Sequence, residues 1–310
     1  MWCGSVGSER DAPERVADNF QGGHLYRVRA RGGWLAVLGA LVLLAGCAAP
    51  EPGPSILTGT VIVGVVEDSP GFGVGDLNPA GFDIDLMNAI GAGLHTPVTP
   101  KPFTIADREP MLDSRNVTIV IATYSITPAR NQRGIDFAGP YMVNPQALLI
   151  RADDTSITTK DSLRGKSVCT EAGGTGGKVD IPGANMTSNN PTTKECVDNL
   201  LAHNTDAVFT DALILYGYKH ANPGKFKVVL PGVFGEQQYY GIGLLGHHHA
   251  DCLKLNAVIS DYLRTQWKHD FQAELPDAVA AYPGSDTSRG DFESQFKPKD
   301  SDMAALSCKL

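Results

Sequence analysis

The sequence predicts an α/β protein in which short strands alternate with helices. The apolar runs 61–66 and 117–121 have the length of buried strands, and the segment 81–94 between them places its apolar residues largely on one helical face. The same alternation recurs after residue 150. Strands that alternate with helices form a parallel sheet covered by helices, and a globular region of roughly 250 residues is long enough for two lobes with full cores.

Each element follows from the local pattern of apolar residues. The first series predicts, in chain order, the strand 61–66, the helix 81–94, the strand 97–103, the short helix 108–112 and the strand 117–121. The second series predicts the short helix 161–163, the strand 166–170, the helix 192–203, the strand 207–210, the helix 211–219, the strands 226–230 and 240–245, and the long helix 250–267. We expect the long helix to face the core with Leu253, Val258, Leu263 and Trp267.

The last part of the chain has a different composition. After Pro276 the sequence becomes rich in Gly, Pro, Ser and Asp, which favour turns and loops. We therefore expect 276–310 to be an extended C-terminal tail that Cys308 holds in place.

The N-terminal segment has the layout of an export signal. Three arginines between 27 and 31 precede the apolar run 34–46, which is shorter than the roughly 20 residues that a spanning helix needs. The run ends in Leu-Ala-Gly-Cys47, which resembles the bacterial lipobox. The alternative is a buried apolar helix that ends in cysteine by coincidence. We expect 1–46 to be a lipoprotein signal peptide, with 1–26 a possible over-extension of the start, Cys47 to carry the lipid, and 47–55 to be a tether.

Charge and cysteine content narrow the class of protein. The formal net charge is −8 and no basic stripe occurs, so the composition excludes a nucleic-acid binder. Apart from Cys3 in the leader and the lipid-bearing Cys47, four cysteines remain, an even number that suggests disulfides in an exported domain. We prefer the pairs Cys169–Cys196 and Cys252–Cys308, because each pair falls inside one proposed lobe; free thiols are the alternative. No CxxC motif indicates zinc, and the consecutive histidines 247–249 cannot all face one ion, so we expect no metal and no cofactor.

Polar residues follow several of the predicted strands. Thr123 and Ser125 come after the strand 117–121, Thr175 lies in the glycine loop after 166–170, and Asp211 follows 207–210. Arg130 lies just beyond Thr127-Pro128, where proline suits a first helical turn and Thr127 its N-cap. Ligands of open α/β sheets bind beyond the carboxyl ends of the strands, so these residues are candidates for one site.

The chemistry of these candidates fits a free α-amino acid. A guanidinium such as that of Arg130 pairs with a carboxylate in two parallel hydrogen bonds, and hydroxyls and loop N–H groups add further donors. The Asp211 carboxylate can accept from an ammonium group. The alternatives are a surface ion pair for Arg130 and a helix cap for Asp211.

An ordered set of motifs resembles the polar amino-acid solute-binding proteins of ABC importers, in their glutamate/glutamine branch. The resemblance covers about 60–270, and it implies a two-lobe periplasmic-binding-protein-like fold of type II. Lobe one would be 56–142 and 239–275, lobe two 146–235, with hinge strands near 142–145 and 236–238 that let the lobes close over one ligand. The motifs are GFDIDL (81–86), ATYSITPAR (122–130), IDFAGPY (135–141), QALLI (146–150), DSLRGKSV (161–168), DAVFTDALIL (206–215) and YGIGL (240–244).

The resemblance also implies roles for single residues. Arg130 looks like the clamp on the α-carboxylate, with Thr123 and Ser125 lining that site and Thr175 a donor from lobe two. Asp211 looks like the acceptor of the α-ammonium group. Arg108 matches an arginine that contacts the side-chain carboxylate in binders of acidic amino acids, and Phe72 either packs on the ligand side chain or belongs to the core.

Some positions depart from the family pattern. Val66 stands where glutamate-binding relatives often carry a basic residue, Thr118 replaces a usual aspartate, and Gly174 stands where serine is frequent. The acids Glu67 and Asp68 near the first loop favour a cationic ligand, whereas Arg108 argues against one. We rank glutamate or aspartate first, glutamine or asparagine second and basic amino acids third.

The resemblance finally implies partners and a location. We expect a monomeric binding protein, not an enzyme, that is lipid-anchored to the outer face of the cell membrane. It would deliver a free amino acid to the permease and ATPase subunits of an ABC importer. The alternatives are an amino-acid sensor module that signals to a membrane partner and a dehydratase-like enzyme on the same fold.

Overall fold

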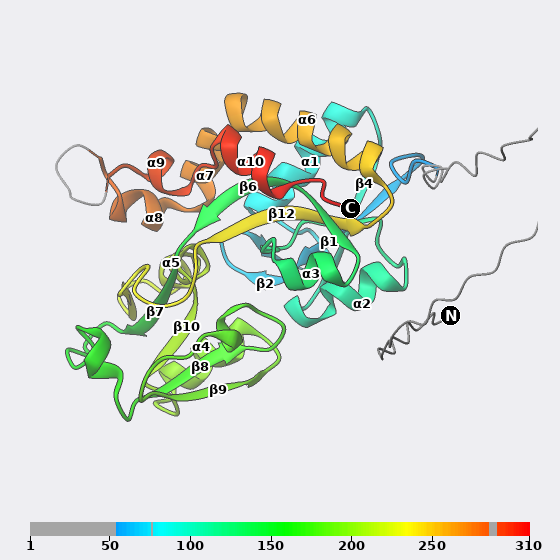
Figure 1. The fold of residues 1–310 in the computed structure, drawn as a ribbon. Helices are drawn as coiled ribbons and strands as arrows, with labels where there is room; N and C mark the ends of the chain where they lie inside the picture. Colours follow the sequence, from blue (N-terminus) through cyan, green and yellow to red (C-terminus); the bar gives the residue numbers. More distant parts are fainter. Residues whose placement is uncertain (1–53, 76, 285–289) are drawn as a thin grey trace, which may run out of the picture. The chain divides into compact units, whose positions relative to one another are not determined.

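Two five-stranded sheets organise the chain in the computed structural model, which describes residues 54–75, 77–284 and 290–310 (Figure 1). The predicted signal peptide, Cys47 and most of the tether lie outside the described residues. The first sheet has the order β4-β1-β5-β12-β6. Its strands are β1 (Val61–Val66), β4 (Val98–Phe103), β5 (Ile119–Val120), β6 (Ile135–Asn144) and β12 (Gln238–Leu245).

The second sheet has the order β11-β7-β10-β8-β9. A small two-stranded ribbon of β2 (Asp68–Ser69) and β3 (Gly73–Val74) follows β1. The strands of the second sheet are β7 (Gln146–Arg151), β8 (Ser167–Glu171), β9 (Asn185–Asn190), β10 (Ala207–Asp211) and β11 (Phe226–Val229).

The prediction of parallel sheets was wrong for one strand of each five-stranded sheet. β12 runs antiparallel to β5 and β6, and β7 runs antiparallel to β10 and β11. In each case the preceding strand along the chain belongs to the other sheet. β6 of the first sheet connects through Pro145 to β7, and β11 of the second sheet connects through 230–237 to β12. Parallel neighbours need a crossover connection, usually a helix, and these two passages have none. The segments proposed as hinges, 142–145 and 236–238, lie at the two passages.

In both lobes, helices follow strands along the chain, as the alternating pattern predicts. The described helices before residue 275 are α1 (Phe82–Leu94), η1 (Ile105–Asp107), α2 (Arg108–Asp113), α3 (Pro128–Gln132), η2 (Lys160–Leu163), η3 (Gly176–Lys178), α4 (Thr193–Leu201), α5 (Ala212–Ala221), α6 (His249–Thr265) and α7 (Trp267–Glu274). None of the helices in the described ranges combines the length and the apolar character that crossing a membrane requires.

Of the four residues predicted to face the core from the long helix, Leu263 and Trp267 are buried and Val258 packs partly buried against it, so the prediction failed for Leu253. Leu253 is 51% exposed, whereas Leu255 and Ile259 are fully buried. Buried residues of α6 recur every four positions at Leu255, Ile259 and Leu263, and Leu253 lies off this stripe, which is why it is exposed.

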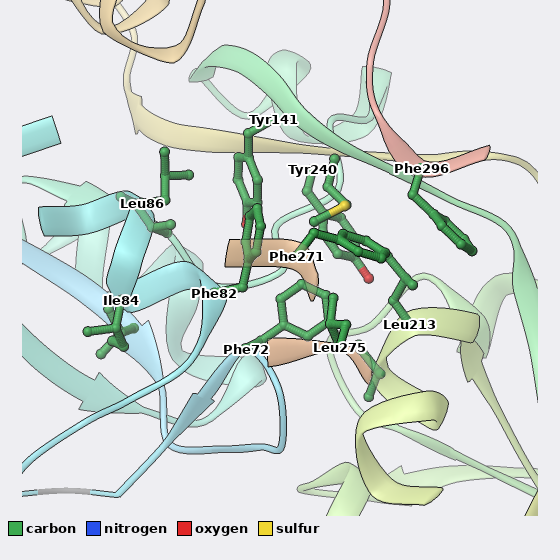
Figure 2. Packing of buried hydrophobic residues seen from close by; sticks show 14 of the residues in the cluster. Phe72, Phe82, Ile84, Leu86, Tyr141, Leu213, Tyr240, Phe271, Leu275 and Phe296 are labelled. Atoms are coloured by element: carbon green, nitrogen blue, oxygen red, sulfur yellow. The ribbon is translucent and has the colours of Figure 1, made fainter. Parts of the chain in front are cut away.

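Alternate residues of β1 belong to two hydrophobic clusters on opposite faces of the first sheet. Val61, Val63 and Val65 of β1 face α1 and α6, while Val66 faces the opposite side with Leu112 of α2. Successive strand residues point to opposite faces, so this alternation is what a sheet covered by helices on both sides requires. The cluster on the α1 and α6 side continues into the second lobe through Leu213 and is rich in aromatic rings (Figure 2).

The C-terminal segment is helical, so the expectation of an extended tail was wrong. It forms α8 (Pro276–Ala281), α9 (Phe292–Phe296) and α10 (Asp300–Leu306), and α10 packs beside β6 (Figure 1). Phe292 and Phe296 stack on Phe271 with ring centroids 5.2 and 5.5 Å apart. Two buried aromatic rings therefore anchor a segment whose composition predicts a loop.

Both predicted disulfides are confirmed. Cys169 of β8 is bonded to Cys196 of α4, and Cys252 of α6 is bonded to Cys308 beyond α10. The second bridge closes a sequence separation of 56 residues and ties the C-terminal helices to the first lobe. Cross-links of this kind stabilise mainly by restricting the unfolded chain.

Phe296→Ala is expected to lower the free energy of unfolding by about 3 kcal/mol, because the fully buried ring leaves a cavity against Phe271. Equilibrium urea denaturation measures the effect. Leu253→Ala serves as the control and should change the same quantity by less than about 0.5 kcal/mol, because this side chain is exposed. Equal small effects from both substitutions would contradict a packed C-terminal segment.

Candidate functional site

Five of the predicted ligand residues line one cavity between the two lobes, at the ends of strands of both sheets. Arg108, Thr123 and Ser125 come from the first lobe, and Thr175 and Asp211 come from the second. The cavity volume is about 10 Å³, which is the room of about one water molecule. The remaining lining residues are Ile105, Glu171, Gly174 and Ile214.

The turn that follows β5 is held in an unusual backbone conformation. Thr123 has a φ of 45°, in the left-handed region that side chains other than glycine rarely adopt. Its N–H donates to Asp83 Oδ2 at 2.9 Å, and its carbonyl accepts from Arg108 Nη1 at 3.2 Å. Its Oγ1 is buried and has no hydrogen-bond partner among the described residues. Strained backbone that surrounding contacts hold in place is frequent at binding sites. Here the hydrogen bonds to Asp83 and Arg108 hold the Thr123 turn in its left-handed conformation.

Arg108 is a buried cation that reaches the second lobe. It is 2% exposed, donates from Nη1 to Ala122 O at 3.1 Å, and donates from Nη2 to Gly173 O at 3.0 Å. Burial lowers its pKa to about 10, and the charge of Arg130 acts in the same direction. Its guanidinium also lies 4.7 Å from the centroid of the Tyr124 ring. Arg108 therefore stays charged at neutral pH although it is buried.

Arg130 lies beside the cavity rather than in its lining. Thr127 caps α3 as predicted, since its Oγ1 accepts from the Arg130 N–H. The guanidinium donates from Nε to Glu109 Oε1 at 3.0 Å, from Nη1 to Ser125 O at 2.6 Å and from Nη2 to Gly173 O at 3.2 Å. Arg130 is 6% exposed and lines an adjoining pocket with Glu171, so its ion pair with Glu109 is a buried one and not the surface pair considered above.

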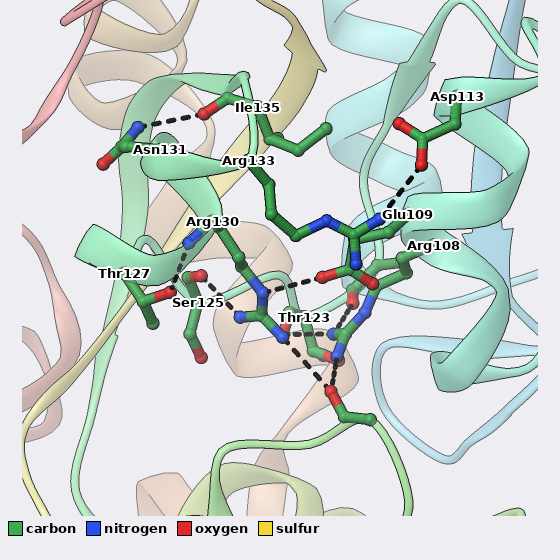
Figure 3. A network of polar contacts seen from close by, with 12 residues as sticks. Arg108, Glu109, Asp113, Thr123, Ser125, Thr127, Arg130, Asn131, Arg133 and Ile135 are labelled. Carbon is green, nitrogen blue, oxygen red and sulfur yellow. Dashed lines mark hydrogen bonds and ion pairs between the residues drawn. The ribbon is translucent and has the colours of Figure 1, made fainter. Parts of the chain in front are cut away.

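Both arginines thus donate to a single carbonyl oxygen of the second lobe. Nη2 of Arg108 and Nη2 of Arg130 both donate to Gly173 O, and dashed lines from the two labelled guanidiniums meet at one oxygen atom in Figure 3. A carbonyl oxygen carries only a partial negative charge, whereas hydrogen bonds from a guanidinium to an ionised oxygen are roughly twice as strong as neutral ones. The point where the two guanidiniums meet is therefore suited to a carboxylate oxygen.

Asp211 supplies the opposite charge from the second lobe. It stands at the N-cap position of α5, but its side chain makes no capping hydrogen bond, so the helix-cap alternative does not describe it. Oδ2 accepts from the hydroxyl of Tyr240 on β12 at 2.5 Å, and Oδ1 has no partner among the described residues. Burial raises the pKa of Asp211 to about 7, and the Tyr240 hydrogen bond opposes this rise. Its buried acceptor is suited to an ammonium group.

Thr175 and Phe72 have different surroundings. Thr175 lines the cavity, and its Oγ1 accepts from Gln146 Nε2 at 3.1 Å. Phe72 does not line the cavity: it is fully buried, with its ring centroid 5.8 Å from that of Tyr240 and 6.3 Å from that of Phe82 (Figure 2). Of the two roles considered for Phe72, the structure shows the one in the core.

The site also contains residues that the sequence reasoning did not select. Glu171 lines the cavity at the end of β8 with 3% exposure, and Glu109 binds Arg130. Asp83 holds the Thr123 turn, and Tyr240 holds Asp211. The strand-end rule that selected Asp211 also applies to Glu171, and Asp83 lies in the GFDIDL segment. Tyr240 opens the YGIGL motif, but the motif does not indicate that its hydroxyl binds Asp211, because only the return of β12 brings it to the second lobe.

The histidines 247–249 lie at the start of α6, away from the cavity lining. In the described ranges, no group of three or more His, Cys, Asp or Glu side chains is arranged to hold a metal ion.

Two mixed α/β lobes, joined by two passages of the chain and facing each other across buried opposite charges, define a two-lobed binding protein of the type II periplasmic fold. A family model of bacterial extracellular solute-binding proteins, family 3, matches residues 61–215. The chain belongs to this family, whose members are extracytoplasmic, and to its glutamate/glutamine branch.

Individual relatives agree with this assignment. The chain is 34% identical over 229 residues to the glutamate-binding protein GluB of Corynebacterium efficiens, covering 67% of this chain and 77% of the relative. It is 31% identical over 196 residues to a glutamine-binding protein of Geobacillus stearothermophilus, covering 60% and 72%. A solved structure of an ancestral arginine-binding protein bound to glutamine matches with a TM-score of 0.62 and 28% identity, covering 70% of this chain and 97% of that one.

The raised pKa of Asp211 predicts a pH dependence of stability. Its pKa rises from 3.8 to about 7 on folding, so its contribution to stability is full below pH 3.8 and is lost as the pH rises to about 7. The free energy of unfolding of the wild type relative to Asp211→Asn should therefore fall by about 2 kcal/mol between pH 5 and pH 8 in urea titrations without amino acids. Asp153→Asn, at an exposed position, should show a constant difference. A constant difference for Asp211→Asn as well would contradict the raised pKa.

Proposed function

We propose that this protein is an extracytoplasmic solute-binding lipoprotein that captures a free polar amino acid by closure of its two lobes and delivers it to an ABC importer. Glutamate and aspartate are the first ligands in this proposal, and glutamine and asparagine follow. The observation that carries it is the convergence of Arg108 and Arg130 on Gly173 O beside the buried carboxylate of Asp211.

Opening of the lobes would release the donors that a ligand needs. Gly173 belongs to the second lobe, so its carbonyl leaves both guanidiniums when the lobes separate. A ligand α-carboxylate then takes its place on Arg130, with the free Oγ1 of Thr123 and the hydroxyl of Thr175 as further partners. The α-ammonium group binds Oδ1 of Asp211, which is buried and accepts from no donor of the described residues.

Closure would follow from ligand contacts with both lobes. Arg130 and Thr123 belong to the first lobe and Asp211 and Thr175 to the second, so one ligand bridges them. A ligand that binds the closed form more tightly shifts the balance toward that form. The passages at Pro145 and 230–237 are the places where the chain can bend, because they are the direct connections between the two sheets.

The preference for an acidic side chain rests on Arg108 and on the relatives. With Arg130 assigned to the α-carboxylate, Arg108 remains as a buried cation in the same cavity for a second carboxylate. Two relatives that are 34% identical to this chain are named glutamate-binding proteins.

The lipid anchor at Cys47 would keep the protein close to its importer. Ser55 Oγ donates to Asp251 Oδ1 at 2.6 Å and the Ile56 N–H donates to Oδ2 at 2.8 Å, so the chain is attached to α6 from Ser55 onward. The stretch from Cys47 to Ser55 reaches at most about 28 Å when fully extended. The permease and ATPase subunits of an importer would then lie within reach of the anchored lobes.

A thermal-shift screen of the domain from Pro54 onward against the twenty amino acids tests the proposal. Glutamate or aspartate should raise the melting temperature, because a ligand that binds only the folded state stabilises it by mass action. Isothermal titration then gives the affinity and a stoichiometry near one. A protein that keeps its cooperative melting transition but responds to none of the twenty would overturn the proposal.

Arg130→Ala is expected to abolish binding, with a loss above roughly 2 kcal/mol, because it removes the charge-assisted partner of the carboxylate and leaves Glu109 without its cation. The matched control is Arg133→Ala at the C-cap of the same helix, where the ion pair with Asp113 is largely exposed. Isothermal titration with the amino acid found in the screen compares both variants with the wild type. An affinity within a few-fold for Arg130→Ala would mean that Arg130 is not the carboxylate clamp.

A further inference from the structure

A second buried carboxylate of the cavity has no role in the binding scheme above. Glu171 ends β8, is 3% exposed and lines the cavity together with Arg108 and Asp211. Its Oε1 accepts from Thr210 Oγ1 at 3.1 Å, and its Oε2 has no hydrogen-bond partner among the described residues. Burial raises its pKa, and hydrogen bonds and the charge of Arg108 act against this rise. A buried acceptor without a donor is costly unless a ligand supplies the donor.

The position of the Glu171 carboxylate depends on a glycine. A Cβ atom added at Gly174 would lie 2.3 Å from Glu171 Oε1 and 2.9 Å from its Cδ. Any side chain at 174 therefore displaces the carboxylate. The serine that the family resemblance led us to expect at 174 has no room while Glu171 keeps its place. The Glu171 carboxylate thus occupies the space that a side chain at position 174 would need, so its position depends on the glycine there.

The charges leave Glu171 and Arg108 for the ligand side chain. In the scheme above, Arg130 takes the α-carboxylate and Asp211 takes the α-ammonium group. An amide side chain offers an acceptor and a donor, so its carbonyl oxygen suits Arg108 and its NH2 group suits the carboxylate of Glu171. A carboxylate side chain offers acceptors only, and it carries the same charge as Glu171. Arg108 favours a carboxylate side chain in the ligand, and Glu171 disfavours one.

We propose that Glu171, in the space left open by Gly174, is a specificity-determining residue that weakens the preference of the site for acidic side chains, so that glutamine and asparagine bind there besides glutamate and aspartate. This inference rests on the proposed function, because it refines which members of that ligand class the same cavity accepts.

The test compares the affinities of glutamate and glutamine by isothermal titration at pH 8, where a carboxyl with a raised pKa is more fully ionised. Glu171→Gln should shift the ratio of the two dissociation constants toward glutamate by about tenfold, since it removes the like charge. Gly174→Ala keeps the charge but displaces the carboxylate, and it should shift the ratio in the same direction. Glu195→Gln, an exposed acid on α4 of the same lobe, is the control and should leave the ratio unchanged.

The outcomes separate this inference from the proposed function. A ratio within about threefold of the wild type in both Glu171→Gln and Gly174→Ala would overturn the role of Glu171 while leaving amino-acid capture intact. A wild type that binds arginine, lysine or histidine in place of glutamine, with Glu171→Gln abolishing that binding, would overturn the amide assignment. A wild type that binds no amino acid would overturn the proposed function itself.

Discussion

The meeting of two arginine side chains at the carbonyl oxygen of Gly173 is the interaction on which the rest of the site depends. Burying a guanidinium without partners is costly, so both cations need acceptors where they are. Arg108 and Arg130 find most of theirs in the first lobe and one shared acceptor in the second. The closed arrangement is therefore held by donors that an anionic ligand can use better than a backbone carbonyl can.

The first lobe prepares these donors before any ligand arrives. Asp83 holds the N–H of Thr123, Arg108 holds the carbonyl, and the Tyr124 ring lies 4.7 Å from one guanidinium and 4.5 Å from the other. Side chains fixed by such contacts lose little freedom on binding, which is the usual source of affinity in a preformed site. In the second lobe, Asp211 accepts a hydrogen bond from the hydroxyl of Tyr240, which belongs to the first lobe.

The site contains buried carboxylates, and burial lowers the stability of their charged form. The pKa values of Asp83 and Asp211 rise to about 7, and that of Glu171 also rises, in each case mainly because burial disfavours the charged form. Groups that make a fold less stable near neutral pH are retained where binding uses them. Asp211 and Glu171 line the cavity, and Asp83 holds the Thr123 turn beside it.

The sequence by itself determined the features that local pattern and chemistry control. It predicted the strand Val61–Val66 to the residue, the N-cap of α3 at Thr127 and four residues of the cavity, because strand ends and helix starts are marked by neighbouring residues. The fifth, Arg108, followed from the family resemblance, and both disulfides followed from placing each cysteine pair inside one lobe. Only the tertiary structure decided that Phe72 belongs to the core, that Phe296 anchors a helical C-terminal segment, and that Glu171 fills the space beside Gly174. These outcomes depend on which surfaces meet after the chain has crossed twice between the sheets, and no local pattern in the sequence specifies those contacts.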